Sequence, residues 1–131
     1  MKKSILILLA LTFSVLGSYA RTSQTSAQDS LVFEKTTHDY GTISQGDDGN
    51  CEFKFTNNGD VPLILSNVKA SCGCTVPEWP KEPIAPGKDA SIKVKYNTNN
   101  VGAFTKTISV NSNAPNSMVV LIIKGIVTAK Q

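Results

Sequence analysis

The sequence predicts an all-β fold, an antiparallel β-sandwich of about seven to eight short strands. Apolar and polar residues alternate with a period of two in several segments, as in strands that bury one face. Clusters of Gly, Pro, Asn, Asp and Ser separate these segments about every 8 to 12 residues, the spacing typical of a sandwich. No segment shows a helical period, so we expect no helix in the folded domain.

The expected strands begin at residue 31 and follow one another to residue 127. They cover residues 31–34, 38–43, 51–56, 63–68, 90–96, 104–110 and 118–127. The strand at 90–96 has the clearest alternation. We expect Asn57-Asn58-Gly59-Asp60 to end the third strand in a tight turn with positive φ angles. A bulge is expected at Lys124-Gly125, where glycine interrupts the last apolar run.

The first twenty residues have the composition of a secretory signal peptide. Lys2 and Lys3 are followed by an apolar run at 5–16 and by small residues up to Ala20. The run is shorter than the ~20 residues that span a bilayer, and no cysteine follows the expected cleavage point. We therefore expect a signal peptide at 1–20, a flexible polar leader at 21–30 and one domain at 31–128. The mature protein would be periplasmic or secreted, with no membrane span.

The charge balance argues against nucleic acid as a partner. The whole chain carries thirteen basic and ten acidic residues. Removing Lys2 and Lys3 with the signal peptide leaves eleven basic residues, and the net charge falls to about +1. A nearly neutral domain without a cluster of Lys and Arg lacks the electrostatic footprint of a nucleic-acid-binding protein.

Ser71-Cys72-Gly73-Cys74-Thr75 is the segment in which chemistry is most expected. Gly73 can take backbone angles that would fold the two cysteines toward each other. Three outcomes are open: a Cys72–Cys74 disulfide, a soft-metal site for Cu(I) made by both thiolates with Met118 as a third ligand, or a bridge from one of them to Cys51. Cys51 shares a strand face with Phe53 and Phe55, so it could equally be a small buried core residue. Three cysteines cannot all pair internally.

No catalytic residues are predicted. A reactive thiol needs a base or a positive charge beside it, and His38, the single histidine, is expected at a strand edge away from the cysteines. Trp79, in the Pro-flanked segment 77–81, has two interpretations. It is either an exposed anchor for a partner or a ring folded over the end of the core.

Several motifs together resemble the bacterial domain-of-unknown-function family 1573. The matching residues are Phe53-x-Phe55-x-Asn57-x-Gly59, Pro62-Leu63-x-Leu65, Ser71-Cys72-Gly73-Cys74-Thr75, Trp79-Pro80, Ile84-x-Pro86-Gly87, Ile92-x-Val94-x-Tyr96 and Ser112-Asn113. The resemblance covers about 33–127. It implies an immunoglobulin-like sandwich, similar to the ASPM/SPD-2/Hydin domains, and export to the cell envelope. It implies no enzymatic activity, and Cys51 is not part of the pattern.

We therefore expect an exported, non-enzymatic binding or scaffold module of the bacterial cell envelope that takes no cofactor. Its candidate binding loop carries Cys72, Gly73, Cys74 and Trp79, and its partner would be an envelope protein or another partner that the sequence does not identify. The alternative is a protein that handles Cu(I) or thiols through Cys72 and Cys74.

Overall fold

The computed structural model describes residues 30–131, and the described part is a sandwich of eight β-strands. The expected signal peptide and all but the last residue of the expected leader lie outside the described residues. The strands are β1 (Leu31–Phe33), β2 (Thr37–Ser44), β3 (Asn50–Asn57), β4 (Leu65–Ala70), β5 (Thr75–Glu78), β6 (Asp89–Tyr96), β7 (Gly102–Ser112) and β8 (Met118–Thr128). The predicted all-β sandwich is confirmed. Residues 30–131 contain no helix with the length and apolar character that crossing a bilayer requires.

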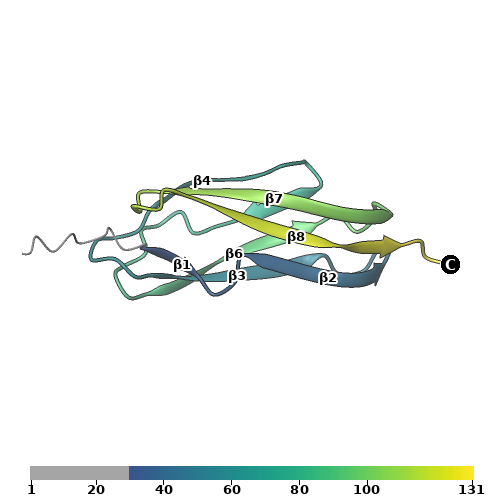
Figure 1. Ribbon diagram of the computed structural model, residues 1–131, viewed down its shortest axis with the longest axis horizontal. Helices are drawn as coiled ribbons and strands as arrows, with labels where there is room; N and C mark the ends of the chain where they lie inside the picture. Colours follow the sequence, from purple (N-terminus) through teal and green to yellow (C-terminus); the bar gives the residue numbers. More distant parts are fainter. Residues whose placement is uncertain (1–29) are drawn as a thin grey trace, which may run out of the picture.

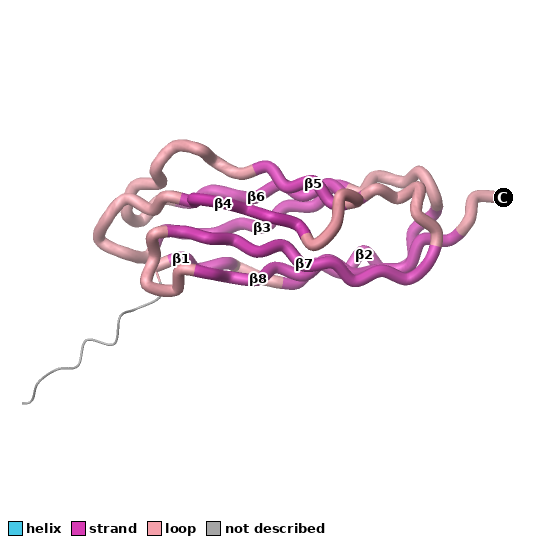
Figure 2. The backbone as a smooth tube through the Cα atoms, turned by 90° about the horizontal axis from the view of Figure 1, so that it is seen from above, coloured by secondary structure: helices cyan, strands magenta, loops and turns pink. Residues whose placement is uncertain are grey.

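The strands form two four-stranded sheets with the orders β1-β3-β6-β5 and β2-β8-β7-β4. They run along the long axis, and the loops gather at the two ends (Figures 1 and 2). Every pairing is antiparallel except that of β2 with β8, which is parallel. The chain passes from one sheet to the other between β1 and β2 without reversing its direction. As a result, β2 runs parallel to β8, its neighbour in the second sheet.

The core lies between the two sheets and is built from the inward-facing residues of the alternating strands. Its fully buried large side chains are Phe53, Phe55, Leu63, Ile92, Val94, Ile108, Val110, Leu121, Ile123 and Val127. Tyr96 and Phe104 add a stacked aromatic pair from opposite sheets, with ring centroids 3.8 Å apart. Each of these residues stood at an apolar position of a predicted strand, so the period-two pattern identified the core.

The sequence pattern missed β5, which pairs with β6 from Thr75↔Tyr96 to Glu78↔Lys93. This strand has four residues and includes Pro77, which has no backbone N–H to donate. β5 is an edge strand, where a proline can face away from the neighbouring strand at no cost. The sequence pattern therefore predicts a loop at the proline-rich segment 77–81, although the first two of these residues belong to β5.

The bulge expected at Lys124-Gly125 is on the neighbouring strand instead. β8 pairs with β7 without a break, whereas the β2–β8 register shifts between Asp39 and Thr42. Gly41, inside that shift, has a φ of 66°. A Cβ on Gly125 would lie 3.0 Å from the Cβ of Tyr40 and 3.1 Å from the carbonyl oxygen of Gly41. Gly125 is thus a close-approach glycine that makes room for the bulge of β2.

The tight turn expected at Asn57-Asn58-Gly59-Asp60 is also wrong. β3 and β4 belong to different sheets, so the segment between them crosses from one sheet to the other and joins no hairpin. Gly59 is not among the residues with positive φ. Its hydrogen atom faces Ser30, since a Cβ at this position would lie 2.6 Å from the Ser30 hydroxyl oxygen.

Two of the four edge strands are closed by side chains. At β1, the Asn116 side chain accepts a hydrogen bond from the Leu31 N–H (3.3 Å) and donates one to the Leu31 carbonyl oxygen (2.8 Å). At β2, the Asp39 carboxylate accepts a hydrogen bond of 2.8 Å from the Gly41 N–H. These side chains occupy backbone groups that a further strand would need.

The other two edges, β5 and β4, lie on the opposite side of the sandwich. In β5, Pro77 has no N–H, and the Thr75 N–H donates to the Cys72 carbonyl oxygen at 3.4 Å. Addition of a partner strand, a common mode of recognition by sheets, is therefore hindered at parts of the edges β1, β2 and β5.

Candidate functional site

The segment Ser71–Thr75 is the turn by which the chain passes from β4, the edge of one sheet, to β5, the edge of the other. Within it Cys72 and Cys74 are joined by a disulfide, with their Cα atoms 5.3 Å apart. Of the three outcomes left open by the sequence, the structure contains the local bridge. Two cysteines separated by one residue can form a disulfide only where the backbone bends. Here the bend is the one by which the chain passes from β4 to β5. We call this segment the disulfide turn.

Hydrogen bonds fasten the disulfide turn to both sheets. The Ser71 N–H donates to the Thr107 carbonyl oxygen (2.8 Å), and the Thr107 N–H donates to the Ser71 hydroxyl oxygen (3.2 Å). On the other sheet the Asn97 N–H donates to the Cys74 carbonyl oxygen at 2.8 Å. The Thr75 side chain is 3% exposed, and its Oγ1 lies 3.8 Å from one sulfur and 3.9 Å from the other. Ser71 and Thr75 therefore hold the ends of the turn.

Gly73, at the tip of the turn, is exposed and has no positive φ. Nothing lies within 4 Å of the position that a Cβ would take. The expectation that the pair depends on backbone angles peculiar to glycine is therefore wrong. Gly73 leaves the tip of the turn uncovered instead.

The disulfide contributes little to the stability of the domain. In the chain-entropy description, a bridge that closes three residues stabilises the fold by about 1.5 kcal/mol, against about 3 kcal/mol for a bridge that closes some twenty residues. A Cys51 bridge would have been of the second kind. The local bond chiefly fixes the shape of an exposed turn that is already tied to both sheets.

Cys51 is a free, half-buried thiol at the start of β3 that packs against the core. Burial raises its pKa, while the neighbouring Tyr40 side chain and the charge of Lys35 act to lower it. The Tyr40 hydroxyl donates its hydrogen bond, of 2.7 Å, to the Gly49 carbonyl oxygen. Cys51 therefore occupies the position of a small core residue, the second of its two interpretations.

His38 is half-buried on the edge strand β2, with its ring 4.5 Å from the ring of Tyr40. Burial lowers its pKa, the charge of Lys35 lowers it further, and Asp39 acts to raise it. No hydrogen bond or ring contact joins His38 to the disulfide turn in residues 30–131. The described residues also contain no group of three or more His, Cys, Asp and Glu side chains able to hold a metal ion. Sulfurs joined to each other present no thiolates, so Cu(I) could bind only to the reduced pair.

Trp79 directly follows β5 and is half-buried, with its ring packed against the core. The Lys81 ammonium lies over the ring, 2.8 Å from its centroid. Trp79 therefore covers the core, as one interpretation expected, and it also lines a surface hollow of about 410 Å³ together with Glu78, Lys81 and Lys93.

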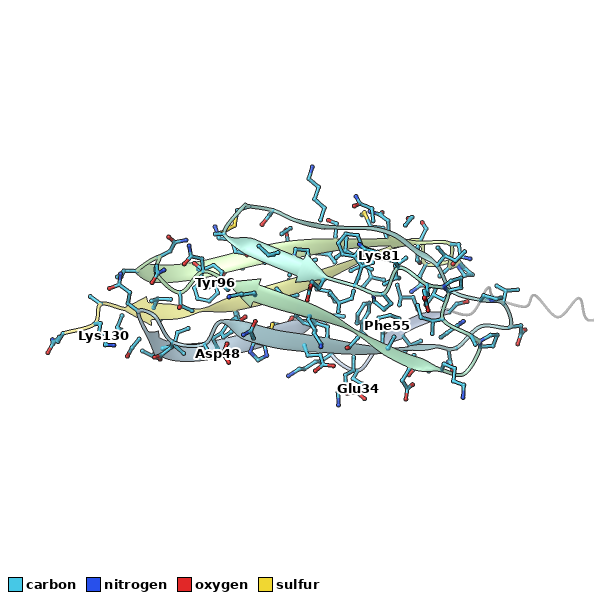
Figure 3. All side chains as sticks on the ribbon, turned by 180° about the vertical axis from the view of Figure 1, so that it is seen from behind. Glu34, Asp48, Phe55, Lys81, Tyr96 and Lys130 are labelled. Carbon is cyan, nitrogen blue, oxygen red and sulfur yellow. A yellow bond between two sulfur atoms is a disulfide. The ribbon has the colours of Figure 1, made fainter. Side chains whose placement is uncertain are left out.

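A second hollow, of about 620 Å³, lies beside the disulfide turn. Its walls include Cys74, Gly73 and the loops 46–49 and 97–99. Figure 3 shows the labelled Asp48 and Tyr96, which also line it, toward the end of the domain that carries Lys130. The sequence did not reveal this hollow, because three segments distant in the chain build it.

A third hollow, of about 370 Å³, connects the two. It shares Asn50, Val76 and Lys95 with the hollow at the disulfide turn, and Glu78 and Lys93 with the hollow at Trp79. The three hollows adjoin one another along β5 and β6, and we call the surface that they line the β5 groove. The structure thus places Cys74 and Trp79 at opposite ends of one surface about four residues of strand long, or ~13 Å.

The comparison with known families agrees with the motifs. The family model described as "Protein of unknown function (DUF1573)" matches residues 31–127. The chain belongs to the DUF1573 family. The family resemblance expected from the motifs is thereby confirmed. Among curated proteins, none matches this DUF1573 chain.

Solved structures show that the DUF1573 domain has an immunoglobulin-like, PapD-like fold. The ASH/PapD-like domain of human CEP192 superposes with a TM-score of 0.66 at 6% identity, over 78% of this chain and 87% of that one. The CsuC–CsuE chaperone–tip adhesion subunit complex of Acinetobacter baumannii gives 0.56 at 8% identity, over 75% and 57%.

The secreted serine protease VesC of Vibrio cholerae gives a TM-score of 0.57 at 16% identity, over 74% of this chain and 23% of the protease. The DUF1573 chain thus spans about a quarter of VesC and rather more than half of the chaperone chain. At these identities the likeness shows the fold alone.

Proposed function

We propose that this chain is an exported, non-enzymatic binding module of the bacterial cell envelope, and that it holds a protein partner in the β5 groove. The observation that carries the proposal is the groove itself, which runs from the disulfide turn to Trp79. The backbone groups already occupied on the edges β1, β2 and β5 favour a face rather than these edges as the binding surface.

Charge along the groove suggests what the partner presents. In the register of the sheet Lys93 lies opposite Glu52 on one side and Glu78 on the other. Lys95 lies opposite Asn50 and Val76, and it lines the hollow at the disulfide turn together with Asp47 and Asp48. Val76 is 58% exposed. A partner segment with an apolar side chain against Val76 and polar side chains that match this mixed charge would complement the groove.

Export is supported by two further features. A disulfide persists in oxidising compartments such as the periplasm and is rare in the bacterial cytosol. The expected signal peptide at 1–20 would deliver the chain there. The likeness in fold to the chaperone–tip adhesion subunit complex and to the CEP192 domain supports a binding role.

The test compares two charge reversals on opposite sheets. Lys95→Glu alters the β5 groove, and Lys124→Glu, exposed on β8, is the matched control. Each purified protein is cross-linked in an envelope extract of the source bacterium. We expect the same partner with the wild type and with Lys124→Glu, and its loss with Lys95→Glu at an unchanged melting temperature. Equal capture by both variants would contradict the assignment of the groove.

A further inference from the structure

The Cys72–Cys74 bond can be reached from solvent on one side in particular. Both cysteines are half-buried and Gly73 between them is exposed. Cys74 and Gly73 form part of the wall of the hollow of about 620 Å³, whereas Cys72 is not in that wall. Of the two bonded cysteines, Cys74 alone therefore borders the hollow, while it also packs against the core.

The disulfide turn does not depend on the bond that closes it. Ser71 exchanges two hydrogen bonds with Thr107 on β7, and the Cys74 carbonyl oxygen accepts one from Asn97. None of these bonds involves a sulfur atom, so we expect them to persist when the sulfurs separate and to keep the two thiols next to each other. A dithiol held in place can re-form its disulfide without a search of the chain. Thr75 Oγ1, within 4 Å of both sulfurs, is placed to donate a hydrogen bond to a newly formed thiolate.

We propose that Cys72–Cys74 is a redox-active disulfide that exchanges with the paired thiols of another protein, and that the exchange begins at Cys74. A thiolate of the incoming dithiol attacks the Cys74 sulfur. A mixed disulfide forms there, the bond to Cys72 breaks, and Cys72 leaves as a thiolate that takes up a proton. The second thiol of the partner, after losing its proton, attacks the partner's own sulfur in the mixed disulfide. It releases Cys74, so the partner ends oxidised and the pair ends as a dithiol.

The third cysteine does not compete in this exchange. Cys51 is half-buried on β3 among core residues, and burial raises its pKa. It therefore remains a protonated thiol at neutral pH and is a weak nucleophile. This activity goes beyond binding in the β5 groove. The two share only the hollow at the disulfide turn, and either could exist without the other.

The first experiment measures whether the bond opens in the folded protein. The full chain carrying Cys51→Ser is equilibrated with mixtures of reduced and oxidised glutathione, then alkylated and weighed by mass spectrometry. We expect complete and reversible conversion to the dithiol, with the amide NMR spectrum changed only near the disulfide turn. A disulfide that resists millimolar glutathione until the protein is denatured would overturn the proposal.

The second experiment distinguishes the two sulfurs. On the Cys51→Ser background, Cys72→Ser leaves the Cys74 thiol and Cys74→Ser leaves the Cys72 thiol, so each variant is the control of the other. We expect the Cys74 thiol to form a mixed disulfide with oxidised glutathione several-fold faster. Equal rates, or a faster Cys72 thiol, would refute attack at Cys74.

The third experiment follows transfer to a substrate. The oxidised Cys51→Ser protein is mixed with a synthetic peptide that contains two reduced cysteines. We expect one peptide disulfide for each protein dithiol formed, and none with the Cys72→Ser/Cys74→Ser variant. A peptide that stays reduced with both proteins would overturn the exchange activity, and loss of partner capture by Lys95→Glu would still test the binding proposal separately.

Discussion

The side-chain amide of Asn57 donates a hydrogen bond of 2.8 Å to the carbonyl oxygen of Ile84, in the buried interior of the sandwich. The same amide donates to the Val61 carbonyl oxygen (2.8 Å), and its oxygen accepts from the Gly59 N–H (3.0 Å). The side chain is 0% exposed. One polar residue thus hydrogen-bonds to three backbone groups in two segments, which also pair with each other through the bridge between Leu63 and Ile84.

Replacing Asn57 by Ala would remove all three hydrogen bonds, and of the three backbone groups only the Ile84 carbonyl oxygen would keep a partner, the Leu63 N–H. We expect a loss of about 3 kcal/mol in the free energy of unfolding, because each hydrogen bond contributes about 1 kcal/mol. Urea denaturation of the wild type and the variant measures the difference. The control is Asn58→Ala, at an exposed position, which should change stability by less than about 0.5 kcal/mol. Similar losses for the two variants would show that the Asn57 side chain is not a structural hub.

Replacement by alanine should affect the stability of the domain differently at two glycines. At Gly125 an added Cβ would lie 3.1 Å from Phe104 Cε1 and equally close to the bulge of β2. At Gly73 nothing lies within 4 Å of the added atom, and φ is not positive. We expect Gly125→Ala to cost about 1–3 kcal/mol through overpacking, and Gly73→Ala to leave stability nearly unchanged. Thermal denaturation in parallel decides this, and an unstable Gly73→Ala would contradict the described geometry of the turn.

The stacking of Lys81 on Trp79 can be isolated because Trp79 is the single tryptophan of the chain. We expect Lys81→Ala to change the tryptophan fluorescence while lowering stability by at most about 1 kcal/mol. Trp79→Ala should cost more, about 2 kcal/mol, since it also removes half-buried ring area from the core. An unchanged emission spectrum in Lys81→Ala would argue against the contact.

Tyr40 makes the domain sensitive to alkali. Its pKa is raised well above the ordinary value of 10.0, first by burial and then by a hydrogen bond with Cys51. The folded state thus disfavours the phenolate, so the contribution of Tyr40 to stability is complete below pH 10 and is lost as the pH rises beyond it. We expect the wild type to lose stability above pH 10 more steeply than Tyr40→Phe. Parallel urea titrations at neutral and alkaline pH measure both slopes, and equal slopes would exclude Tyr40 as the cause.

The alternating pattern was sufficient for the sandwich because seven of the eight strands bury one face against a single core. The pattern failed at features that depend on the pairing of strands and not on the alternation of apolar and polar residues. Pro77 is compatible with a strand only because β5 is at an edge, and the edge position depends on the pairing of the whole sheet. The bulge was predicted at Gly125 but lies at Gly41 on the neighbouring strand. A glycine inside a strand is compatible with either a bulge or a close approach of another chain segment, so the sequence alone does not distinguish the two.

The candidate site was foreseeable only in part. The spacing of Cys72 and Cys74 left the local bridge among three outcomes, since nothing in the sequence placed Cys51 relative to them. That Cys74 faces a hollow follows from the approach of the loops 46–49 and 97–99 to the disulfide turn, which joins residues from three parts of the chain. The position of Lys95 in the groove depends on its pairing with Asn50 and Val76, and the sequence does not give this register.

The parallel pairing of β2 with β8 has a mechanical consequence. The described chain starts at one end of the domain and finishes at the other (Figure 1). Tension applied between those ends pulls β2 and β8 past each other, so the six paired positions from Thr37↔Ile122 to Ser44↔Thr128 resist together instead of opening one after another. We expect the domain to withstand stretching best along this axis. Single-molecule pulling from residues 30 and 131, compared with pulling across the β7–β8 hairpin, should show the higher rupture force for the first geometry.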